Sequence, residues 1–596
     1  MDSELSAQRC VPPSPEIEWQ VGRSSPPTVA WTAPAFHRLP RYALRHPSRA
    51  GYSGERSIGQ APNEAHAALS GNAAWPARAL GRRRAMRYGP VAELARSLAV
   101  FGTASDVGKS VVATALCRHF SDRGVRVAPF KAQNMSNNSG VTSEGAEMGR
   151  AQIVQAVAAR LEPHVDMNPV LLKPTSDCMS HVVLLGQPWT DCHARDYYQV
   201  GDQRPLVRAA ESALERLRAR YELVVIEGAG SCAEVNLRSH DFVNFPMAHA
   251  ADAPVVLVAD IDRGGVFAQV VGTLDVLPEG DRRRVGGVII NRFRGDVSLF
   301  QAGVTYLEQR TGLPVFGVLP FLEQLGIESE DAVPLEMVLD PPIRRSAGDQ
   351  RAWIAVLRLP HVSNFTDFDP LARHPQVTLH YLSRPRALDD YDLLLLPGTK
   401  SVRADLDWLR RLGWTERIAS HRERGGRVAG VCGGYQMLGR DIADPQGLEG
   451  APGNTPGLGL LDTQTTFAAD KALHRVEGIW TATGAPFRGY EIHLGRTERS
   501  GGQAPVRITR RSGHACDRAD GAISSDGRVW GTYVHGLFDE PALVRDLLMS
   551  LGTGVTSEGG GAGANAHREQ RLDALADHFR RHVDTAAIES LLGLAR

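Results

Sequence analysis

Disulfide frameworks, membrane spans and secretory leaders find little support in this sequence. Its seven cysteines form no CxxC pair, and an odd number cannot all pair with one another. This pattern predicts a protein of the reducing cytoplasm rather than a disulfide-stabilised secreted one. No apolar run approaches the roughly 20 residues of a membrane-spanning helix, and no charged start with an apolar core indicates a signal peptide.

An excess of charge of one sign is also missing. Lys plus Arg and Asp plus Glu both total 67, which gives a formal net charge of zero. We therefore expect neither wholesale nucleic-acid binding nor attraction to an anionic membrane surface. Hydrophobic residues make up 42% and charged residues 22% of the 596 residues, values typical of a globular chain with about two to four domains.

Residues 1–96 differ from the rest of the chain in composition. They are rich in Pro, Ala, Ser and Arg and carry no sustained apolar period. Such a composition predicts a disordered extension. We interpret Arg82-Arg83-Arg84 as solvated charge rather than a targeting element, and Met86 offers an alternative start shortly before the first expected strand.

A phosphate-binding loop is predicted at Gly102-Thr103-Ala104-Ser105-Asp106-Val107-Gly108-Lys109-Ser110. The apolar run 98–101 before it predicts a buried strand, and residues 111–120 after it carry apolar side chains at helical spacing. Strand, loop and helix in this order direct loop N–H groups, the helix N-terminus and the Lys109 ammonium toward an anion, and the Ser110 hydroxyl suits Mg²⁺. Five residues rather than four separate Gly102 from Gly108, and Thr103 stands where the first Gly of the motif is expected. Because both flanking elements are indicated, we favour this interpretation over a chance Gly-Lys-Ser.

Alternating strand and helix patterns divide the remaining chain into two α/β regions. In residues 97–334, near-continuous apolar strands are expected at 125–130, 223–226, 254–259, 287–290 and 315–318. They are typical of a parallel sheet covered by helices on both faces. Residues 335–351 are interpreted as a linker. In 352–596 we expect strands at 353–357, 393–396, 428–431 and 529–534, a Gly-rich loop at 552–565 and a closing helical segment near 568–592.

Ligands of parallel sheets gather at the carboxyl ends of the strands, and polar side chains follow the expected strands of the first region there. They are Lys131, the run Glu227-Gly228-Ala229-Gly230-Ser231, Asp260 with Asp262, and Asn291 with Arg292.

A second chemical centre is predicted at Gly430-Val431-Cys432-Gly433-Gly434. Small residues around a strand-terminal Cys are typical of a nucleophile elbow, whose following N–H groups bind an oxyanion. His535, at the end of the last strand, is the candidate base, and the loop 397–400 is a second source of oxyanion N–H groups. For His493 a structural or substrate-positioning role is at least as well supported as a catalytic one.

These motifs resemble the cobyric acid synthase family, glutamine-dependent amidotransferases of cobalamin biosynthesis. The resemblance covers about residue 98 to the C-terminus. Its most specific parts are the runs Gln-Asn-Met-Ser-Asn-Asn-Ser at 133–139 and Met-Asn-Pro-Val-Leu-Leu-Lys-Pro at 167–174. The loop at 102–110 and the run at 227–231 by themselves indicate only the wider amidoligase group that includes dethiobiotin synthetases, while Val-Cys-Gly-Gly-Tyr-Gln-Met-Leu-Gly at 431–439 and Gly-Thr-Tyr-Val-His-Gly at 531–536 add the glutaminase part.

The resemblance implies a P-loop amidoligase domain followed by a class I glutamine amidotransferase domain. ATP would phosphorylate the b, d, e and g carboxylates of adenosylcobyrinic acid a,c-diamide, and ammonia from glutamine would displace the phosphate. Lys109 and Lys131 would neutralise phosphate charge, and Ser110 and Glu227 are the expected Mg²⁺ ligands. Asn291 resembles the position that contacts the nucleotide base. Cys432 would attack the glutamine carboxamide.

Related glutaminase domains carry a Glu two residues after the His, and here that position is Leu537. In the cobyric acid synthase branch Cys and His suffice. The group that orients His535 is therefore left open between a backbone carbonyl and Glu491. The sequence does not decide between a monomer and a homo-oligomer.

The sequence motifs are shared in part by two other classes of protein. A cobyrinic or hydrogenobyrinic acid a,c-diamide synthase would use the same chemistry on two other carboxylates, and the run 133–139 argues against it. A partitioning-type P-loop ATPase would explain the loop at 102–110 but neither Cys432 nor His535.

Overall fold

The structure, a computed structural model, describes residues 94–175, 179–193, 197, 203–322, 345–346, 348–552 and 563–594. All of these belong to one unit, Tyr88–Arg596. Nearly all of the predicted disordered extension, most of the predicted linker and residues 553–562 of the Gly-rich loop lie outside the described residues.

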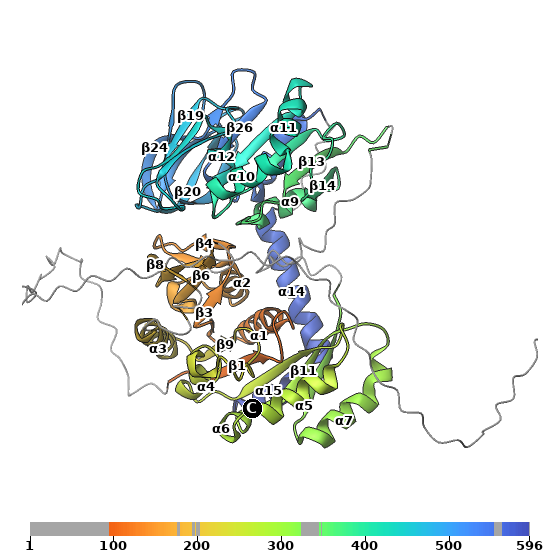
Figure 1. Cartoon of the computed structure of the whole chain (residues 1–596). Coiled ribbons are helices and arrows are strands. Elements are labelled where there is room, and N and C mark those ends of the chain that lie inside the picture. Colours follow the sequence, from red (N-terminus) through yellow and green to blue (C-terminus); the bar gives the residue numbers. More distant parts are fainter. Residues whose placement is uncertain are drawn as a thin grey trace, which may run out of the picture. The chain divides into compact units, whose positions relative to one another are not determined.

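The first region is built on a six-stranded sheet in the order β12-β11-β10-β1-β9-β2, with every pairing parallel (Figure 1). Its strands are β1 (Arg96–Gly102), β2 (Val127–Phe130), β9 (Leu223–Glu227), β10 (Val255–Asp260), β11 (Val285–Phe293) and β12 (Val315–Pro320). All six strands predicted from apolar runs are confirmed. Because the strands are parallel, their carboxyl ends meet at one edge of the sheet.

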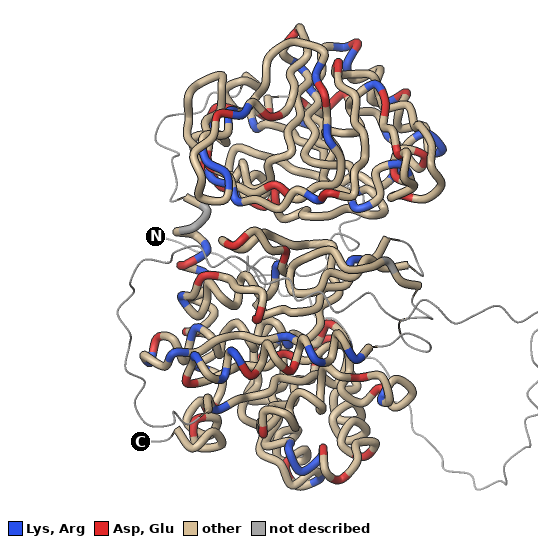
Figure 2. The backbone as a smooth tube through the Cα atoms, turned by 90° about the vertical axis from the view of Figure 1, so that its left-hand side faces the viewer, with Lys and Arg blue, Asp and Glu red and all other residues tan. Residues whose placement is uncertain are grey.

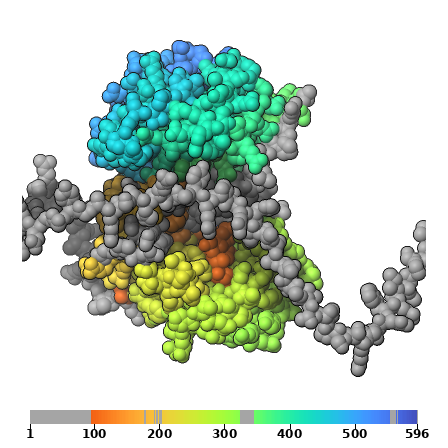
Figure 3. Space-filling view, in the orientation of Figure 1, coloured from red at the N-terminus to blue at the C-terminus, as the bar shows by residue number. Residues whose placement is uncertain are grey.

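Helices cover both faces of this sheet, as the continuous apolar strands require. Alternate residues of β1 point to opposite faces: Ala99 and Phe101 belong to one buried cluster, and Leu98 and Val100 to the other. The first cluster includes side chains from α3 (Arg204–Arg220), α4 (Phe245–Ala250), α5 (Val266–Val276) and α7 (Gln301–Thr311). The second includes side chains from α1 (Lys109–Asp122) and α2 (Arg150–Ala158). The short α6 (Glu279–Arg282) precedes β11, and the elements from α4 to α7 form the yellow-to-green surface in Figure 3.

Two small β elements that the sequence did not indicate interrupt the first region. One is a four-stranded sheet of β3 (Gln133–Met135), β6 (Val170–Pro174), β7 (Met179–Leu184) and β8 (Gln187–His193). The other is the hairpin of β4 (Ser139–Val141) and β5 (Glu147–Gly149). The three-residue strands β3, β4 and β5 leave too short an alternation for a sequence pattern to reveal.

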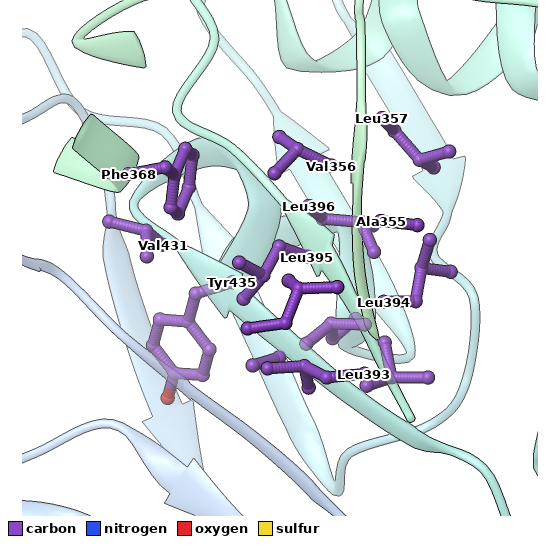
Figure 4. Close-up of a cluster of buried hydrophobic side chains, with 14 of the residues drawn as sticks. Ala355, Val356, Leu357, Phe368, Leu393, Leu394, Leu395, Leu396, Val431 and Tyr435 are labelled. Carbon is purple, nitrogen blue, oxygen red and sulfur yellow. The ribbon is translucent and has the colours of Figure 1, made fainter. Parts of the chain in front are cut away.

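The second region is built on another six-stranded sheet, ordered β14-β13-β15-β16-β26-β25. Its strands are β13 (Ala352–Leu357), β14 (Val377–Leu382), β15 (Leu393–Leu396), β16 (Arg427–Val431), β25 (Ala522–Ile523) and β26 (Val529–Thr532). The four leucines of β15 are fully buried and lie among side chains of β13 in Figure 4. Each contributes about 1.5–3 kcal/mol of burial free energy, which fixes the centre of this sheet.

Helices and further strands surround this second sheet. The helices are α9 (Asp369–Ala372), α10 (Val402–Leu412), α11 (Trp414–Glu423), α12 (Gly433–Leu438) and α13 (Pro541–Ser550). A five-stranded sheet contains β20 (Ala472–Trp480), β21 (Pro486–His493), β23 (Val506–Arg511), β24 (His514–Asp520) and β27 (Val534–His535). A four-stranded sheet contains β17 (Asp441–Asp444), β18 (Gly453–Pro456), β19 (Thr463–Thr466) and β22 (Arg496–Arg499).

The single strand predicted at 529–534 is wrong in its extent. The chain leaves the central sheet after Thr532, and β27 pairs instead with β21 of the five-stranded sheet. The backbone N–H groups of Tyr533 and Val534 bond to the Asp520 carboxylate and the Thr532 hydroxyl, so the chain turns there. This turn brings His535 next to β21.

The predicted closing helical segment consists of two helices, α14 (Ala564–His582) and α15 (Thr585–Leu591), separated at Val583 and Asp584. Both pack on the first sheet rather than the second. Arg118 of α1 donates to the carboxylate of Asp573, and the Arg96 guanidinium donates to the Leu592 carbonyl. The end of the chain therefore joins the first region, where the blue α14 lies among orange-to-green elements in Figure 1.

Lys and Arg are interspersed with Asp and Glu along the backbone tube of the described residues (Figure 2). Among the described residues no helix is long and apolar enough to span a membrane.

Candidate active sites

The predicted phosphate-binding loop follows β1, whose last residue is Gly102, and α1 begins at Lys109. Gly108 has φ 98°, and a Cβ there would lie 2.0 Å from Asn291 Nδ2, so a side chain does not fit. Asn291 Nδ2 itself donates to the Val107 carbonyl at 2.9 Å. The strand-loop-helix prediction is confirmed, and Asn291 lies against the loop.

The Lys109 side chain lies inside the loop and is 7% exposed. Its Nζ donates to the carbonyls of Ala104 at 3.0 Å and Gly230 at 2.7 Å. The run 227–231 after β9 is thereby brought to the loop, as predicted from the sheet edge. Thr103 Oγ1 donates to Gln269 Oε1 of α5 at 3.3 Å.

Glu227 is the centre of a buried polar cluster below the loop. Its Oε1 accepts from Ser110 Oγ at 2.8 Å and from Lys131 Nζ at 2.9 Å, and its Oε2 accepts from Gln155 Nε2 at 2.5 Å. Three predicted site residues thus meet here: Ser110 of α1, Glu227 of β9 and Lys131 of the segment after β2. Gln155 of α2 was not predicted, because nothing in a helical Gln signals a site.

An arginine between two carboxylates closes one side of the loop. Arg292 donates to Asp260 Oδ2 at 2.9 Å and to Asp106 Oδ1 at 3.0 Å. Asp260 is the last residue of β10 and Arg292 lies near the end of the neighbouring β11, so their meeting follows from the sheet order. The pairing with Asp106 ties the loop to the end of β11.

Cys432 occupies the predicted elbow between β16 and α12. Its backbone has φ 53° and ψ −110°, a conformation that non-glycine residues rarely adopt. Gly434 is required there, because a Cβ would lie 2.1 Å from the Leu396 carbonyl oxygen. The sharp turn presents the thiol, whose Sγ donates to the Ile492 carbonyl at 3.3 Å. The predicted strand-turn-helix geometry is present, and the nucleophile role of Cys432 stays a prediction.

His535 is held by Asp367, a residue that the sequence did not single out. His535 Nδ1 lies 2.6 Å from Asp367 Oδ2, and the Gly536 N–H donates to Asp367 Oδ1 at 3.1 Å. Both side chains are almost fully buried. Asp367 lies 168 residues before His535, in the short helix Phe365–Phe368 rather than directly at the end of a strand, so neither spacing nor motif could have indicated it.

The electrostatic surroundings of His535 favour its protonated form. Burial lowers its pKa, but the Asp367 carboxylate and Cys432 outweigh this and raise the pKa to about 10. The ring of Tyr490 stacks on the imidazole, with centroids 5.1 Å apart and planes inclined by 16°. A protonated imidazole beside the thiol can give a proton to a departing nitrogen.

Glu491, one of the two groups left open for orienting His535, does not do so. Its Oε2 accepts from Arg511 Nε at 2.7 Å instead. Neighbouring residues of β21 point to opposite sides, and Tyr490 rather than Glu491 pairs with His535 in the register. A backbone carbonyl is likewise not the partner of Nδ1.

The loop 397–400 lies beside both His535 and the Cys432 elbow. A Cβ on Gly398 would be 3.2 Å from His535 Cε1, and one on Gly433 would be 2.7 Å from Thr399 Cγ2. Its position fits the predicted second source of oxyanion N–H groups. His493 is neutral at ordinary pH, because burial lowers its pKa to about 3, and its Nδ1 bonds to the Gly495 carbonyl at 3.1 Å. This geometry supports the structural or substrate-positioning role.

Within the run 167–174, Lys173 belongs to a buried cluster of ion pairs. Lys173 Nζ lies 2.6 Å from Glu147 Oε1, and Lys471 Nζ from the second region lies 2.5 Å from Glu147 Oε2. Burial raises the pKa of Glu147, but the two lysines more than compensate and hold it well below its usual range. The fully buried Glu147 carboxylate thus joins the two regions by ion pairs with one lysine from each.

Two family models match the chain. Residues 98–335 match a "CobQ/CobB/MinD/ParA nucleotide binding domain", and residues 353–543 match a "CobB/CobQ-like glutamine amidotransferase domain". Together with the phosphate-binding loop and the Cys432–His535 pair, these matches define a glutamine-hydrolysing ligase that carries a nucleotide-binding domain.

The chain is 54% identical over 502 residues to the cobyric acid synthase of Chlorobaculum tepidum, covering 84% of this chain and 98% of the relative. It is 53% identical to the cobyric acid synthase of Chlorobium phaeobacteroides strain BS1, with 84% and 99% covered. The chain belongs to the cobyric acid synthase family. It functions in glutamine-dependent amidation in cobalamin biosynthesis, as the resemblance implied.

Proposed function

We propose that this enzyme amidates the b, d, e and g carboxylates of adenosylcobyrinic acid a,c-diamide, a corrinoid, in four rounds that each use one ATP and one glutamine. The observation that carries the proposal is the presence of two complete sites in one chain: the cluster of Lys109, Ser110, Lys131 and Glu227, and the triad of Cys432, His535 and Asp367. A phosphate cradle supports activation of a carboxylate, and a cysteine elbow supports release of ammonia.

In the synthetase site, the loop 102–110 would hold the ATP phosphates. Lys109 and Lys131 would neutralise charge as the terminal phosphoryl group passes to the corrinoid carboxylate, forming an acyl phosphate and ADP. Ammonia then attacks the acyl carbon, the C–O bond to phosphate breaks, and an amide and inorganic phosphate result. Asn291, already bound to the loop, would lie near the nucleotide base.

The residues at this site fit a magnesium ion. Ser110 Oγ and Glu227 Oε1 are 2.8 Å apart, and a hydroxyl and a carboxylate are the hard oxygen donors that Mg²⁺ prefers. Glu227 is fully buried, so its negative charge must be balanced by cations close to it. Lys131 provides one such positive charge. Bound Mg²⁺ would neutralise phosphate charge.

In the glutaminase site, the Cys432 sulfur would attack the glutamine carboxamide carbon. The thiol proton would pass to His535 as the sulfur attacks, and His535 would give that proton to the departing nitrogen, so that the C–N bond breaks, ammonia leaves and a glutamyl thioester remains. Water activated by His535 would then hydrolyse the thioester to glutamate and restore the thiol. Asp367 keeps the His535 Nδ1 proton in place and directs the other ring nitrogen to the sulfur.

The test is mass spectrometry of adenosylcobyrinic acid a,c-diamide incubated with enzyme, ATP, Mg²⁺ and glutamine. Each amidation replaces OH by NH₂ and lowers the mass by about 1 Da, so the four additions are resolved as successive steps. Product with four new amides supports the proposal. If the a,c-diamide is left unchanged while cobyrinic acid is amidated twice, the enzyme is an a,c-diamide synthase instead.

A further inference from the structure

Helix α2 touches both active sites through its own side chains. At its first residue, Arg150 donates to the Tyr490 hydroxyl, and its guanidinium carbon lies 5.3 Å from the Tyr490 ring centroid. Five residues further on, Gln155 donates to Glu227. Tyr490 stacks on His535 of the glutaminase site, and Glu227 belongs to the nucleotide site. A nine-residue helix, about 13 Å long, thus has one contact at each site.

The N-terminal end of α2 is fixed to the segment that carries Asp367. The Arg150 N–H donates to the Asn138 carbonyl, and the Asn138 side-chain oxygen accepts from Thr366 Oγ1 at 3.3 Å. Asn364 accepts from the Ser139 N–H at 3.2 Å and donates to the Tyr490 hydroxyl at 3.2 Å. The specific run 133–139 of the first region is therefore bonded to the residues that directly precede Asp367.

We propose that α2 couples the two sites, with Arg150 and Tyr490 acting as positioning residues for His535. The proposal rests on the glutaminase role of Cys432 and His535 given above. Both oxygens of Glu227 are engaged in the described state, one of them by Gln155. Binding of Mg²⁺ and nucleotide would draw Glu227 toward the metal and change its bond to Gln155. Because a short helix moves as one body, Arg150 would shift with Gln155 and move the Tyr490 ring on His535.

Such coupling has two measurable consequences. Nucleotide binding would change the rate of glutamine hydrolysis, and glutamine binding would change nucleotide affinity. Linkage equates only the two effects on binding and sets no such equality for kcat. The first is measured as kcat and KM for glutamine hydrolysis by the full chain, with and without a Mg²⁺ complex of a non-hydrolysable ATP analogue. The second is measured as the Kd of that analogue for Cys432→Ala, with and without glutamine.

For the unsubstituted enzyme we expect the analogue to change kcat for glutamine hydrolysis by about 5-fold or more, the lower end of common coupling factors. In Arg150→Ala and in Tyr490→Phe this factor should fall to within about twofold of unity. Tyr490→Phe keeps the stacked ring and removes only the hydroxyl, so it tests the contact even if Arg150→Ala fails to fold. Adding Arg150→Ala to Cys432→Ala should abolish the effect of glutamine on analogue affinity.

Arg475→Ala is the matched control. The Arg475 side chain also joins the two regions, by donating to the Val141 carbonyl and to Glu162. Its backbone pairs with Tyr490 in the strand register, which alanine preserves, and these side-chain bonds involve neither the Tyr490 hydroxyl nor α2. It should keep the full response. The proposal is overturned if the unsubstituted enzyme shows no response, if Arg150→Ala and Tyr490→Phe keep it, or if Arg475→Ala loses it equally. A Cys432→Ala variant that still hydrolyses glutamine would instead refute the glutaminase assignment.

Discussion

His535 Nδ1 and Asp367 Oδ2 lie 2.6 Å apart, and this buried pair completes a triad with Cys432. The Asp comes from the segment after β13, whereas related class I glutaminase domains place a Glu two residues after the His, where this chain has Leu537. Under the proposed function, a carboxylate from a different part of the chain would thus take the same chemical role. The physical requirement is a buried negative charge on Nδ1, and the fold supplies it independently of local sequence.

Replacing Asp367 by Asn should impair only the glutamine-dependent reaction. Asn keeps the shape but removes the charge that fixes the imidazole, so glutamine-dependent amidation should fall about 10²–10³-fold. Amidation with ammonium should stay within about threefold of the unsubstituted enzyme. Product mass with the two nitrogen sources measures both. Asp369→Asn, which removes a carboxylate charge paired with Arg373, is the control and should retain both activities.

The stability of the glutaminase region should depend on pH through His535. Its pKa is raised from 6.5 to about 10 in the fold, so the pair contributes stability fully below about pH 6.5 and loses it as pH rises through about 10. The contribution is on the order of 1–4 kcal/mol. Urea unfolding midpoints at pH 7 and pH 10 should differ less for His535→Asn than for the unsubstituted enzyme. An equal difference in both would contradict the raised pKa.

Removing the Lys109 side chain should abolish amidation with either nitrogen source. The Lys109 ammonium lies inside the phosphate-binding loop, where it donates to the Ala104 and Gly230 carbonyls. Among the described residues, no other cationic side chain is seen to bond to these two carbonyls. Product is measured at saturating ATP. Arg126→Ala, an exposed change in the same region, should leave the product yield unaltered. Substantial product from Lys109→Ala would refute the phosphate-cradle assignment.

Cys432→Ala and Glu227→Gln should separate the two chemistries. The first removes the nucleophile, so it should fail with glutamine yet amidate with high ammonium at a pH where free NH₃ is present. The second removes a carboxylate of the nucleotide site and should fail with both sources. Cys516→Ala is the control for the loss of a thiol. Failure of a folded Cys432→Ala with ammonium would show that the two sites are not chemically separable.

Residues 1–85 should be dispensable for activity. Their composition predicts disorder, and the match to the nucleotide-binding family begins only at residue 98. A chain that begins at Met86 should therefore be as soluble and as active as the full chain, with a thermal midpoint within about 2 °C. Loss of folding on this truncation would show that the composition was misinterpreted.

Short sequence patterns were enough to predict the sites whose residues are neighbours in the chain. The phosphate-binding loop and the Cys432 elbow each consist of one strand, one turn and one helix start, and steric rules tie such turns to Gly and small residues. The meeting of Lys131, Glu227 and Ser110 could also be expected, because parallel strands bring their carboxyl ends to one edge. For these parts the sequence by itself determined the local fold and which side chains meet.

Only the tertiary structure decided what depends on distant segments. Asp367 reaches His535 across 168 residues, and the turn at Tyr533 that moves His535 from one sheet to another leaves no periodic signal. Gln155 and Arg150 lie on a short helix without a recognisable motif. Only their contacts, with Glu227 and Tyr490 respectively, indicate a role. The helices α14 and α15 return to the first sheet because it offers an apolar face, a choice made by packing. Hydrophobic burial is non-directional, so a sequence specifies that such surfaces are covered but not by which segment.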